Sequence, residues 1–149
     1  MRTTVTAFIF YKNKLLMVFH KKLKKWLHVG GHVESGELPS EALTREIREE
    51  TNLEVKIVDC GITNVFVKKN LRPEPIPFSM HSSIKKRELM IDYVAVALNP
   101  EKISLQKEEL TNYKWVTKVG LTKVNTFPLL RTLAFKAFEA YEGVSAKFK

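Results

Sequence analysis

The chain has almost no cysteine and no long apolar run. Cys60 is the single cysteine in 149 residues, so no internal disulfide can form. No apolar run approaches the roughly 20 residues that a membrane-spanning helix needs. Residues 1–14 alternate like a strand and lack a small-residue cleavage site, which argues against a signal peptide. We therefore expect a cytoplasmic protein with no membrane partner.

The sequence also lacks internal repeats, low-complexity tracts and linkers. A length of 149 residues suits one domain, and about two-thirds of the unfolded surface is buried at this size. The hydrophobic fraction of 44% and the charged fraction of 28% are ordinary for a globular protein. We expect residues 1–149 to form a single domain.

Acidic residues are fewer than basic residues: the chain has 16 Asp and Glu and 25 Lys and Arg, which gives a formal net charge of +9. The basic residues cluster at 20–25, 67–72 and 84–88. A basic field favours anionic partners such as nucleotides, phosphates or nucleic acid. From the charge alone, a solvated lysine-rich surface is the preferred interpretation of the same composition.

The hydrophobic pattern predicts strands before and after one central helix. Alternating or apolar runs indicate strands at 2–10, 15–20, 54–67, 89–98 and 112–117, with a break at the glycines 30–31. The prolines of residues 68–88 indicate a long loop. This order predicts an α/β (α+β) sandwich with a mixed sheet.

Two helices are predicted. The first runs from Pro39 to Thr51 and stops at Asn52, a residue that accepts the left-handed backbone of a helix end. The second, a closing helix that packs on the core, is capped by Thr126 and closed by Gly143.

The first predicted helix concentrates acid in an otherwise basic chain. Glu46, Glu49 and Glu50 are three and four residues apart and share one face. Like charges at this spacing destabilise a helix, and a hard divalent cation such as Mg²⁺ or Mn²⁺ would offset the repulsion. A solvated acidic helix face is the alternative interpretation of the three glutamates alone.

Two further features accompany these glutamates. Arg45 can hold a carboxylate in bidentate geometry, and Glu37 in the preceding loop is a candidate partner. Gly30 and Gly31 allow a tight turn and a close approach to a ligand.

The complete spacing resembles the Nudix box, which reads Gly-x5-Glu-x7-Arg-Glu-apolar-x-Glu-Glu-x-Gly-apolar. Gly31, Glu37, the run from Arg45 to Glu50 and Leu53 match it. The one departure is Asn52, which replaces the final glycine and tolerates the same backbone. The motif has many fixed positions and spans 23 residues, and the predicted element order is compatible with the family's α/β/α sandwich.

The resemblance implies Mg²⁺-dependent hydrolysis of a diphosphate linkage, with Mn²⁺ able to substitute. Substrates would be a nucleoside triphosphate, a nucleotide sugar, ADP-ribose or a dinucleoside polyphosphate. Glu46, Glu49 and Glu50 would bind metal, with Glu46 the base in some members, and Gly31 or its neighbour Gly30 would offer a carbonyl. Glu37 and Arg45 would fix the loop against the helix.

Residues outside the box are weaker candidates. Family members often recruit a further carboxylate before a Trp near the last strand. Here Glu109 precedes Trp115, while Glu108 and Glu88 compete for the role. Trp26 and Phe78 are candidates for stacking a base, and Lys25 for steering an anionic substrate. Core packing and a solvated surface are the alternatives for these three residues.

Two other functions stay open. The chain could act on RNA 5′ ends, which the net charge supports mildly, although no RNA-binding module is recognisable. It could also be a catalytically silent nucleotide-binding domain, but such domains usually lose box glutamates and this chain keeps them all. The sequence leaves the oligomeric state open, a homodimer included.

Overall fold

Strand β1 lies at the centre of a mixed sheet in the computed structural model, which describes residues 1–60 and 74–146. It pairs in parallel with β7, and antiparallel with β2 and with β4. β3 and β8 extend the sheet from β2, and β5 and β6 both pair with β7. The strands are β1 (Arg2–Tyr11), β2 (Lys14–His20), β3 (Lys25–Leu27), β4 (Val29–His32), β5 (Val55–Val58), β6 (Ser79–Ser83), β7 (Glu88–Ala97) and β8 (Leu110–Val116).

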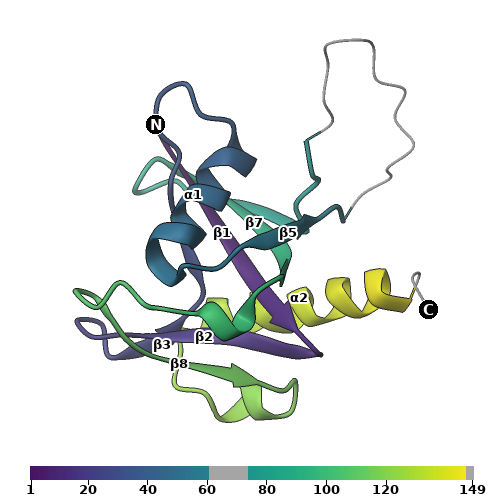
Figure 1. The fold of residues 1–149 in the computed structure, drawn as a ribbon. Helices are drawn as coiled ribbons and strands as arrows, with labels where there is room; N and C mark the ends of the chain where they lie inside the picture. The colour runs from purple at the N-terminus through teal and green to yellow at the C-terminus, as the bar shows by residue number, and fades with distance from the viewer. Residues whose placement is uncertain (61–73, 147–149) are drawn as a thin grey trace.

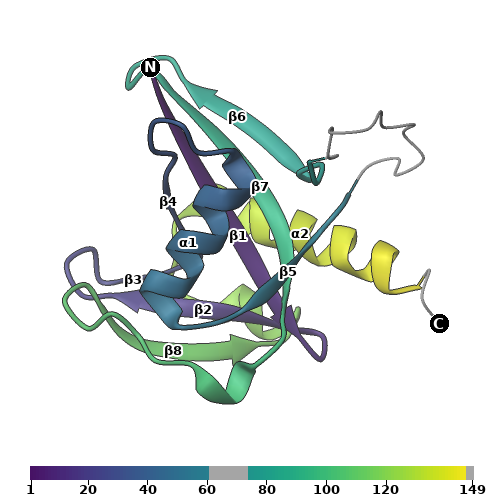
Figure 2. The ribbon, with the colours of Figure 1, turned by 45° about the horizontal axis from the view of Figure 1, so that its top comes forward.

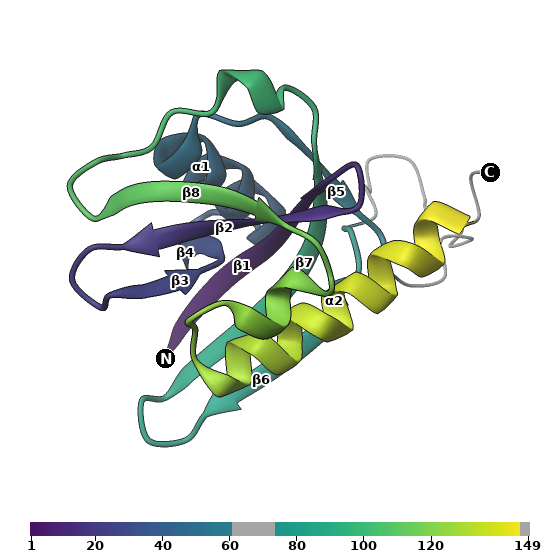
Figure 3. The same ribbon diagram turned by 90° about the horizontal axis from the view of Figure 1, so that it is seen from below.

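Two helices cover opposite faces of this sheet (Figure 1, Figure 3). Alternate residues of β1 point to opposite faces. Val5 and Ile9 pack in the core that contains residues of α1 (Pro39–Thr51). Phe8 and Phe10 pack in the core that contains residues of α2 (Pro128–Ala146). The predicted α/β/α sandwich with a mixed sheet and a closing helix is confirmed.

Helix α1 has the bounds that the sequence predicts. It begins at Pro39, and the Leu38 backbone N–H donates to Glu41 Oε1 at 2.9 Å. It ends where Asn52 takes a left-handed conformation with φ of 61°. Ala42, Leu43 and Ile47 are fully buried, and Figure 2 shows the helix lying across β1 and β4. The capping residues at both ends and the buried apolar face therefore all favour a helix with these bounds.

Other predicted bounds are wrong or only partly covered. Residues 79–83 form strand β6 on the edge of β7, although they were expected to lie in a loop. The strand predicted over 54–67 is present as β5 only at 55–58, and its residues 61–67 lie outside the described part. Residues 68–73 of the predicted loop lie outside it as well.

The ends of α2 also differ from expectation. The buried Thr126 hydroxyl has no hydrogen-bond partner among the described residues, so it does not cap the helix. The helix continues past Gly143 to Ala146, because an exposed glycine lowers helix propensity without forcing an end. Neither helix in residues 1–60 and 74–146 is long and apolar enough to cross a membrane.

Candidate active site

A pocket of about 450 Å³ opens between α1, β4 and the segment before β8. Glu46, Glu49 and Glu50 reach it from α1, Gly31 from β4 and Glu109 from the end of the segment that leads into β8. With Gly30, six of the candidates named from the sequence therefore line one cavity, although they come from three separate parts of the chain. The remaining lining residues are His20, Leu27, His28, His32, Gln106 and Leu110.

The two glycines of β4 create the space for this pocket. They do not form the expected tight turn, because both lie in β4 and pair with Thr6 and Val5 of β1. A Cβ at Gly31 would overlap the carboxylate of Glu46, and a Cβ at Gly30 would overlap the Val5 carbonyl oxygen. Gly31 therefore leaves room for an acidic side chain, and Gly30 lets the two strands approach closely.

Arg45 joins the loop before α1 to the acidic face of the helix. Its Nε donates to Glu37 Oε2 at 2.8 Å and its Nη2 donates to Glu37 Oε1 at 2.9 Å, which is the predicted bidentate pair. Nη2 also donates to the His32 carbonyl at 3.0 Å. The hydrogen bond from Arg45 lowers the pKa of Glu37 to about 2, with a smaller contribution from the Glu34 backbone N–H.

The same guanidinium contacts two of the acidic residues on α1. Arg45 Nη1 donates to Glu46 Oε1 at 2.9 Å and lies 3.4 Å from Glu49 Oε2. The hydrogen bond to Glu37 is the main cause of the raised pKa of Arg45. Arg45 therefore stays charged and holds the loop and the helix together at the edge of the pocket.

Glu50 is a partly buried carboxyl group that lies among the other glutamates of the pocket. Burial, followed by the negative charges of Glu46, Glu109 and Glu49, raises its pKa to about 8. A backbone hydrogen bond from Gly30 opposes the shift. The negative charge of the carboxylates in this pocket is therefore only partly balanced by the positively charged side chains of the protein.

Glu109 is held in the pocket by backbone contacts of its own segment. The Lys21 N–H donates to the Glu109 carbonyl at 2.7 Å, and the Gln106 N–H donates to the Glu50 carbonyl at 2.9 Å. Phe19 of β2 pairs with Asn112, but the next residue, His20, pairs with Leu110, so β8 carries one extra residue here. Bulges of this kind re-aim side chains next to functional sites.

The competing carboxylates lie elsewhere. Glu108 accepts a hydrogen bond from Gln106 Nε2 at 3.4 Å and does not line the pocket. Glu88 starts β7 and accepts a hydrogen bond from the Thr4 hydroxyl. Of the three candidates for a further acid, the structure brings only Glu109 to the box glutamates.

The three substrate-binding candidates do not line this pocket. Trp26 packs on Phe19, with the Lys114 ammonium 4.1 Å from the centre of its ring. Lys25 Nζ donates to Asn125 Oδ1 at 2.8 Å. Phe78 packs edge-on against Phe8 with ring centres 5.6 Å apart. Their contact with substrate stays a prediction.

A buried polar cluster next to the pocket was not recognised from the sequence. Asp92 of β7 is 1% exposed; its Oδ1 accepts a hydrogen bond from Thr6 at 2.7 Å, and its Oδ2 lies 3.1 Å from His81 Nδ1. Burial raises the pKa of Asp92. The available signal was a single aspartate inside the apolar run of β7, which indicates a buried charge that needs partners.

His28 links this cluster to the pocket. Its ring packs on Phe8 with centres 4.8 Å apart, and its Nδ1 is buried with no hydrogen-bond partner among the described residues. Burial, with a smaller contribution from the neighbouring His81, lowers the pKa of His28 to about 4. The imidazole is therefore neutral at pH 7 and can both donate and accept a hydrogen bond.

The donor set suits a hard divalent cation. Four carboxylates and the backbone carbonyls of β4 are the oxygen ligands that Mg²⁺ and Mn²⁺ prefer, and a cation would relieve the repulsion at Glu50. In residues 1–60 and 74–146, however, no three His, Cys, Asp or Glu side chains already converge tightly enough to hold a metal. Arg45 draws Glu46 and Glu49 to one side. Binding therefore requires rotation of a side chain such as Glu49, which is 60% exposed.

Comparisons with known proteins agree with this geometry. A hydrolase of the NUDIX family from Clostridium perfringens has a solved structure with a TM-score of 0.75 and 28% identity, covering 93% of this chain and 96% of that one. The NAD-capped RNA hydrolase ndx-9 of Caenorhabditis elegans is 36% identical over 109 residues, which are 70% of this chain and 25% of that protein.

An uncharacterised Nudix hydrolase, all7351 of Nostoc, is 34% identical over 65 residues, which are 44% of this chain and 34% of that protein. The chain thus matches about a quarter of the first curated relative and about a third of the second. The model of the NUDIX domain matches residues 1–131. That match covers most of the chain, and the protein accordingly belongs to the NUDIX family of hydrolases.

Proposed function

We propose that this protein hydrolyses a diphosphate bond in a nucleoside diphosphate joined to another moiety, with Mg²⁺ as the natural cation and Mn²⁺ as a substitute. Family enzymes generally use divalent cations, and the oxygen-rich pocket fits them. Residues 1–149 act as one catalytic domain in this proposal. A cytoplasmic setting accords with the single cysteine.

One observation carries the proposal. Glu46, Glu49, Glu50 and Glu109 line a single pocket together with Gly31, next to the ion pair between Arg45 and Glu37. A solvated acidic helix face requires neither a fourth carboxylate from a distant segment nor a glycine that leaves room for Glu46. Both features are typical of a site that binds a cation and a phosphate.

The pocket residues would each contribute to hydrolysis of the diphosphate bond. Glu46, Glu49 and Glu50 would hold a divalent cation, which would neutralise phosphate oxygens and lower the pKa of water. A carboxylate, Glu46 or a neighbour, accepts the proton of the attacking water. The water oxygen bonds to one phosphorus and the bridging P–O bond breaks, which leaves a nucleoside monophosphate and a phosphorylated remainder. Arg45 keeps the acidic side chains in place and Gly31 keeps space for them.

The test is a panel of diphosphate compounds with Mg²⁺ or Mn²⁺, in which nucleoside monophosphate is measured by chromatography. We expect turnover of at least one compound, loss of turnover with a chelator, and loss in Glu49→Gln and Glu50→Gln. Glu101→Gln, a change at an exposed glutamate outside the pocket, is the matched control. Turnover that survives both pocket substitutions would falsify the site, and absence of turnover on every compound would contradict the proposed activity.

A second candidate substrate is the 5′ end of RNA. Two observations favour it: the net charge of +9 and the similarity to ndx-9, whose name describes an NAD-capped RNA hydrolase. Contacts to an RNA backbone make affinity steeply salt-dependent. Activity on capped or triphosphate RNA that falls steeply with salt, while activity on free nucleotides does not, would support this candidate.

A further inference from the structure

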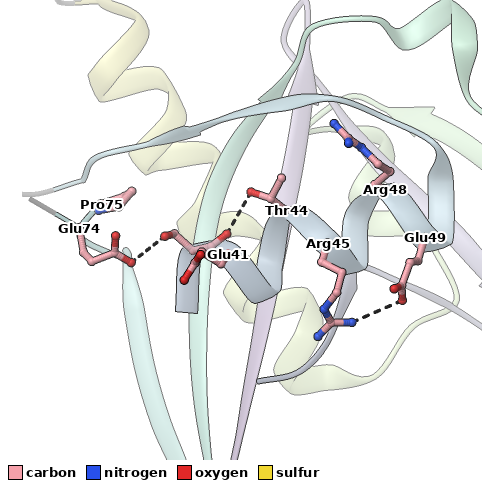
Figure 4. Close-up of a pocket in the computed structure, with 8 residues that line it drawn as sticks. Glu41, Thr44, Arg45, Arg48, Glu49, Glu74 and Pro75 are labelled. Atoms are coloured by element: carbon pink, nitrogen blue, oxygen red, sulfur yellow. Dashed lines mark hydrogen bonds and ion pairs between the residues drawn. The ribbon is translucent and has the colours of Figure 1, made fainter. Parts of the chain in front are cut away.

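The side chain of Glu109 is the least restrained of the four carboxylates in the proposed catalytic pocket. Arg45 contacts both Glu46 and Glu49, and Figure 4 shows its contact with Glu49 from the outer side of α1. Glu50 is partly buried and accepts a backbone hydrogen bond. Glu109 is 68% exposed and has no arginine or backbone partner for its carboxylate among the described residues. Its carboxylate therefore needs a restraint of another kind in order to face a cation.

His20 is the only side chain of residues 1–60 and 74–146 within ion-pair distance of Glu109, with Nε2 3.7 Å from Oε2. It ends β2, and its backbone pairs with Lys25 of β3 on one side and with Leu110 of β8 on the other. The extra residue of β8 produces the pairing with Leu110, which brings the preceding Glu109 beside the His20 ring. The ring lines the pocket and is only 16% exposed. A well-held imidazole therefore lies next to a loosely held carboxylate.

A backbone hydrogen bond determines which nitrogen of the His20 ring carries the proton. The Leu23 N–H donates to Nδ1 at 3.1 Å. Because a backbone N–H can only donate, Nδ1 is the unprotonated nitrogen of a neutral imidazole, and the single ring proton lies on Nε2. Nε2 is the nitrogen that lies 3.7 Å from Glu109. The ring therefore presents an N–H donor to the carboxylate, and the turn between β2 and β3 keeps it in that orientation.

We propose that His20 positions the carboxylate of Glu109 for cation binding. A small rotation of the exposed Glu109 side chain closes the 3.7 Å separation to a hydrogen bond from Nε2. One carboxylate oxygen then accepts from His20, and the other stays available to a cation. The inference rests on the proposed diphosphate hydrolysis and adds a positioning residue to its site, since His20 acts on Glu109 and not on the substrate.

The same histidine also stabilises the turn that joins β2 to β3. In that turn, the Lys24 N–H donates to the His20 carbonyl at 2.8 Å, and Lys24 has a φ of 54°. A histidine that served the turn alone would need only Nδ1, the acceptor for Leu23. The two roles use different nitrogen atoms, so two substitutions can separate them. The side-chain oxygen of asparagine lies near the position of Nδ1, and the side-chain nitrogen of glutamine lies near that of Nε2.

The experiment compares His20→Asn with His20→Gln. His20→Asn keeps an acceptor for the Leu23 N–H but is too short to reach Glu109, whereas His20→Gln keeps a donor towards Glu109 and loses the acceptor. Each protein is characterised by calorimetry with Mn²⁺, by kcat/KM on the diphosphate compound with the highest turnover, and by urea denaturation. Lys22→Gln, at an exposed position of the same turn that does not line the pocket, is the matched control.

We expect His20→Asn to weaken Mn²⁺ binding and to lower kcat/KM, each about tenfold, with little change in the urea midpoint. His20→Gln should recover most of the Mn²⁺ affinity and kcat/KM and lower the urea midpoint instead. Lys22→Gln should change none of the three quantities. Wild-type Mn²⁺ affinity and kcat/KM in His20→Asn would overturn the positioning role, and so would equal losses of both quantities in the two His20 variants.

Two further measurements test how His20 acts. In a mutant cycle with Glu109→Ala, His20→Asn should add little to the loss that Glu109→Ala already causes, and strictly additive losses would overturn action through Glu109. Nitrogen-15 NMR of the metal-free protein identifies the protonated ring nitrogen, and a proton on Nδ1 would overturn the donor role. A wild-type protein that neither binds Mn²⁺ nor hydrolyses any diphosphate compound would instead overturn the proposed function.

Discussion

Arg45 and Glu37 are joined by two parallel hydrogen bonds, from Nε to Oε2 at 2.8 Å and from Nη2 to Oε1 at 2.9 Å. The pair connects the loop that follows β4 to the helix that carries three of the acidic residues. Its geometry requires a planar guanidinium, because the single ammonium group of a lysine cannot donate in this fork. The arrangement of the glutamates on α1 therefore depends on Arg45, which is itself a basic residue.

We expect Arg45→Lys to lower kcat/KM about 10- to 100-fold, as for changes to groups that orient metal ligands. Arg45→Gln should also raise the pKa of Glu37 from about 2 towards its ordinary value, because the main stabilising hydrogen bond is lost. Carbon-13 NMR of the Glu37 carboxyl group measures the shift. Glu37→Gln and the double variant complete a mutant cycle, and strictly additive losses would contradict coupling of the pair.

Gly30 and Gly31 should respond differently to the same substitution. A Cβ at Gly30 meets the backbone of Val5, which cannot move away, so Gly30→Ala should destabilise the fold by about 1–3 kcal/mol. A Cβ at Gly31 meets only the end of the Glu46 side chain. Gly31→Ala should therefore keep most of the stability and lower kcat about 100-fold by displacing that carboxylate. Urea denaturation and steady-state kinetics measure the two effects, and an active Gly31→Ala protein would argue against the placement of Glu46.

Glu109 and its neighbour Glu108 form a second matched pair. Only Glu109 lines the pocket and adds negative charge beside Glu50. Glu109→Gln should weaken Mn²⁺ binding, measured by calorimetry, and lower turnover about 10- to 100-fold. Glu108→Gln should change neither quantity. Equal effects of the two substitutions would remove Glu109 from the site.

The buried His28 predicts a loss of stability in mild acid. Its pKa is lowered to about 4 in the folded protein, whereas the unfolded chain takes up the proton near pH 6.5. At His28 the unfolded state therefore binds more protons between these values, and the contribution of His28 to the free energy of unfolding should fall by about 2–3 kcal/mol as the pH drops from 6.5 to 4.

His28→Phe tests this origin, because the ring that packs on Phe8 is retained and the proton site is removed. Urea titrations of both proteins at pH 7 and pH 4.5 give the comparison. The raised pKa values of Glu50 and Asp92 act in the opposite direction in both proteins, so the difference between them isolates His28. Parallel changes in the stability of the two proteins would contradict the assigned role of His28.

Local sequence patterns are sufficient to predict the bounds of some helices and strands but not of others. Helix α1 has its predicted bounds because Pro39, Asn52 and the buried stripe all act within the helix itself. Strand β6 was missed because residues 79–83, "SMHSS", have no apolar alternation and become a strand through pairing with β7. The strand position of Gly30 and Gly31 depends likewise on the neighbouring β1.

The same distinction holds for the candidate site. The spacing of Glu46, Glu49 and Glu50 on one helix could be recognised because helical geometry brings them together. The contact between Asp92, Thr6 and His81 joins three strands, and no spacing along the chain encodes it. The choice of Glu109 over Glu108 depends on the extra residue of β8, which a sequence pattern does not locate.

The segment that carries Glu109 is fastened to α1 through main-chain atoms. The Ser104 N–H donates to the Thr51 carbonyl and the Gln106 N–H donates to the Glu50 carbonyl, each at 2.9 Å. Such bonds are indifferent to the side chains of residues 104 and 106. The side chains at these two positions can therefore change during evolution while the spacing between α1 and the segment that carries Glu109 is kept.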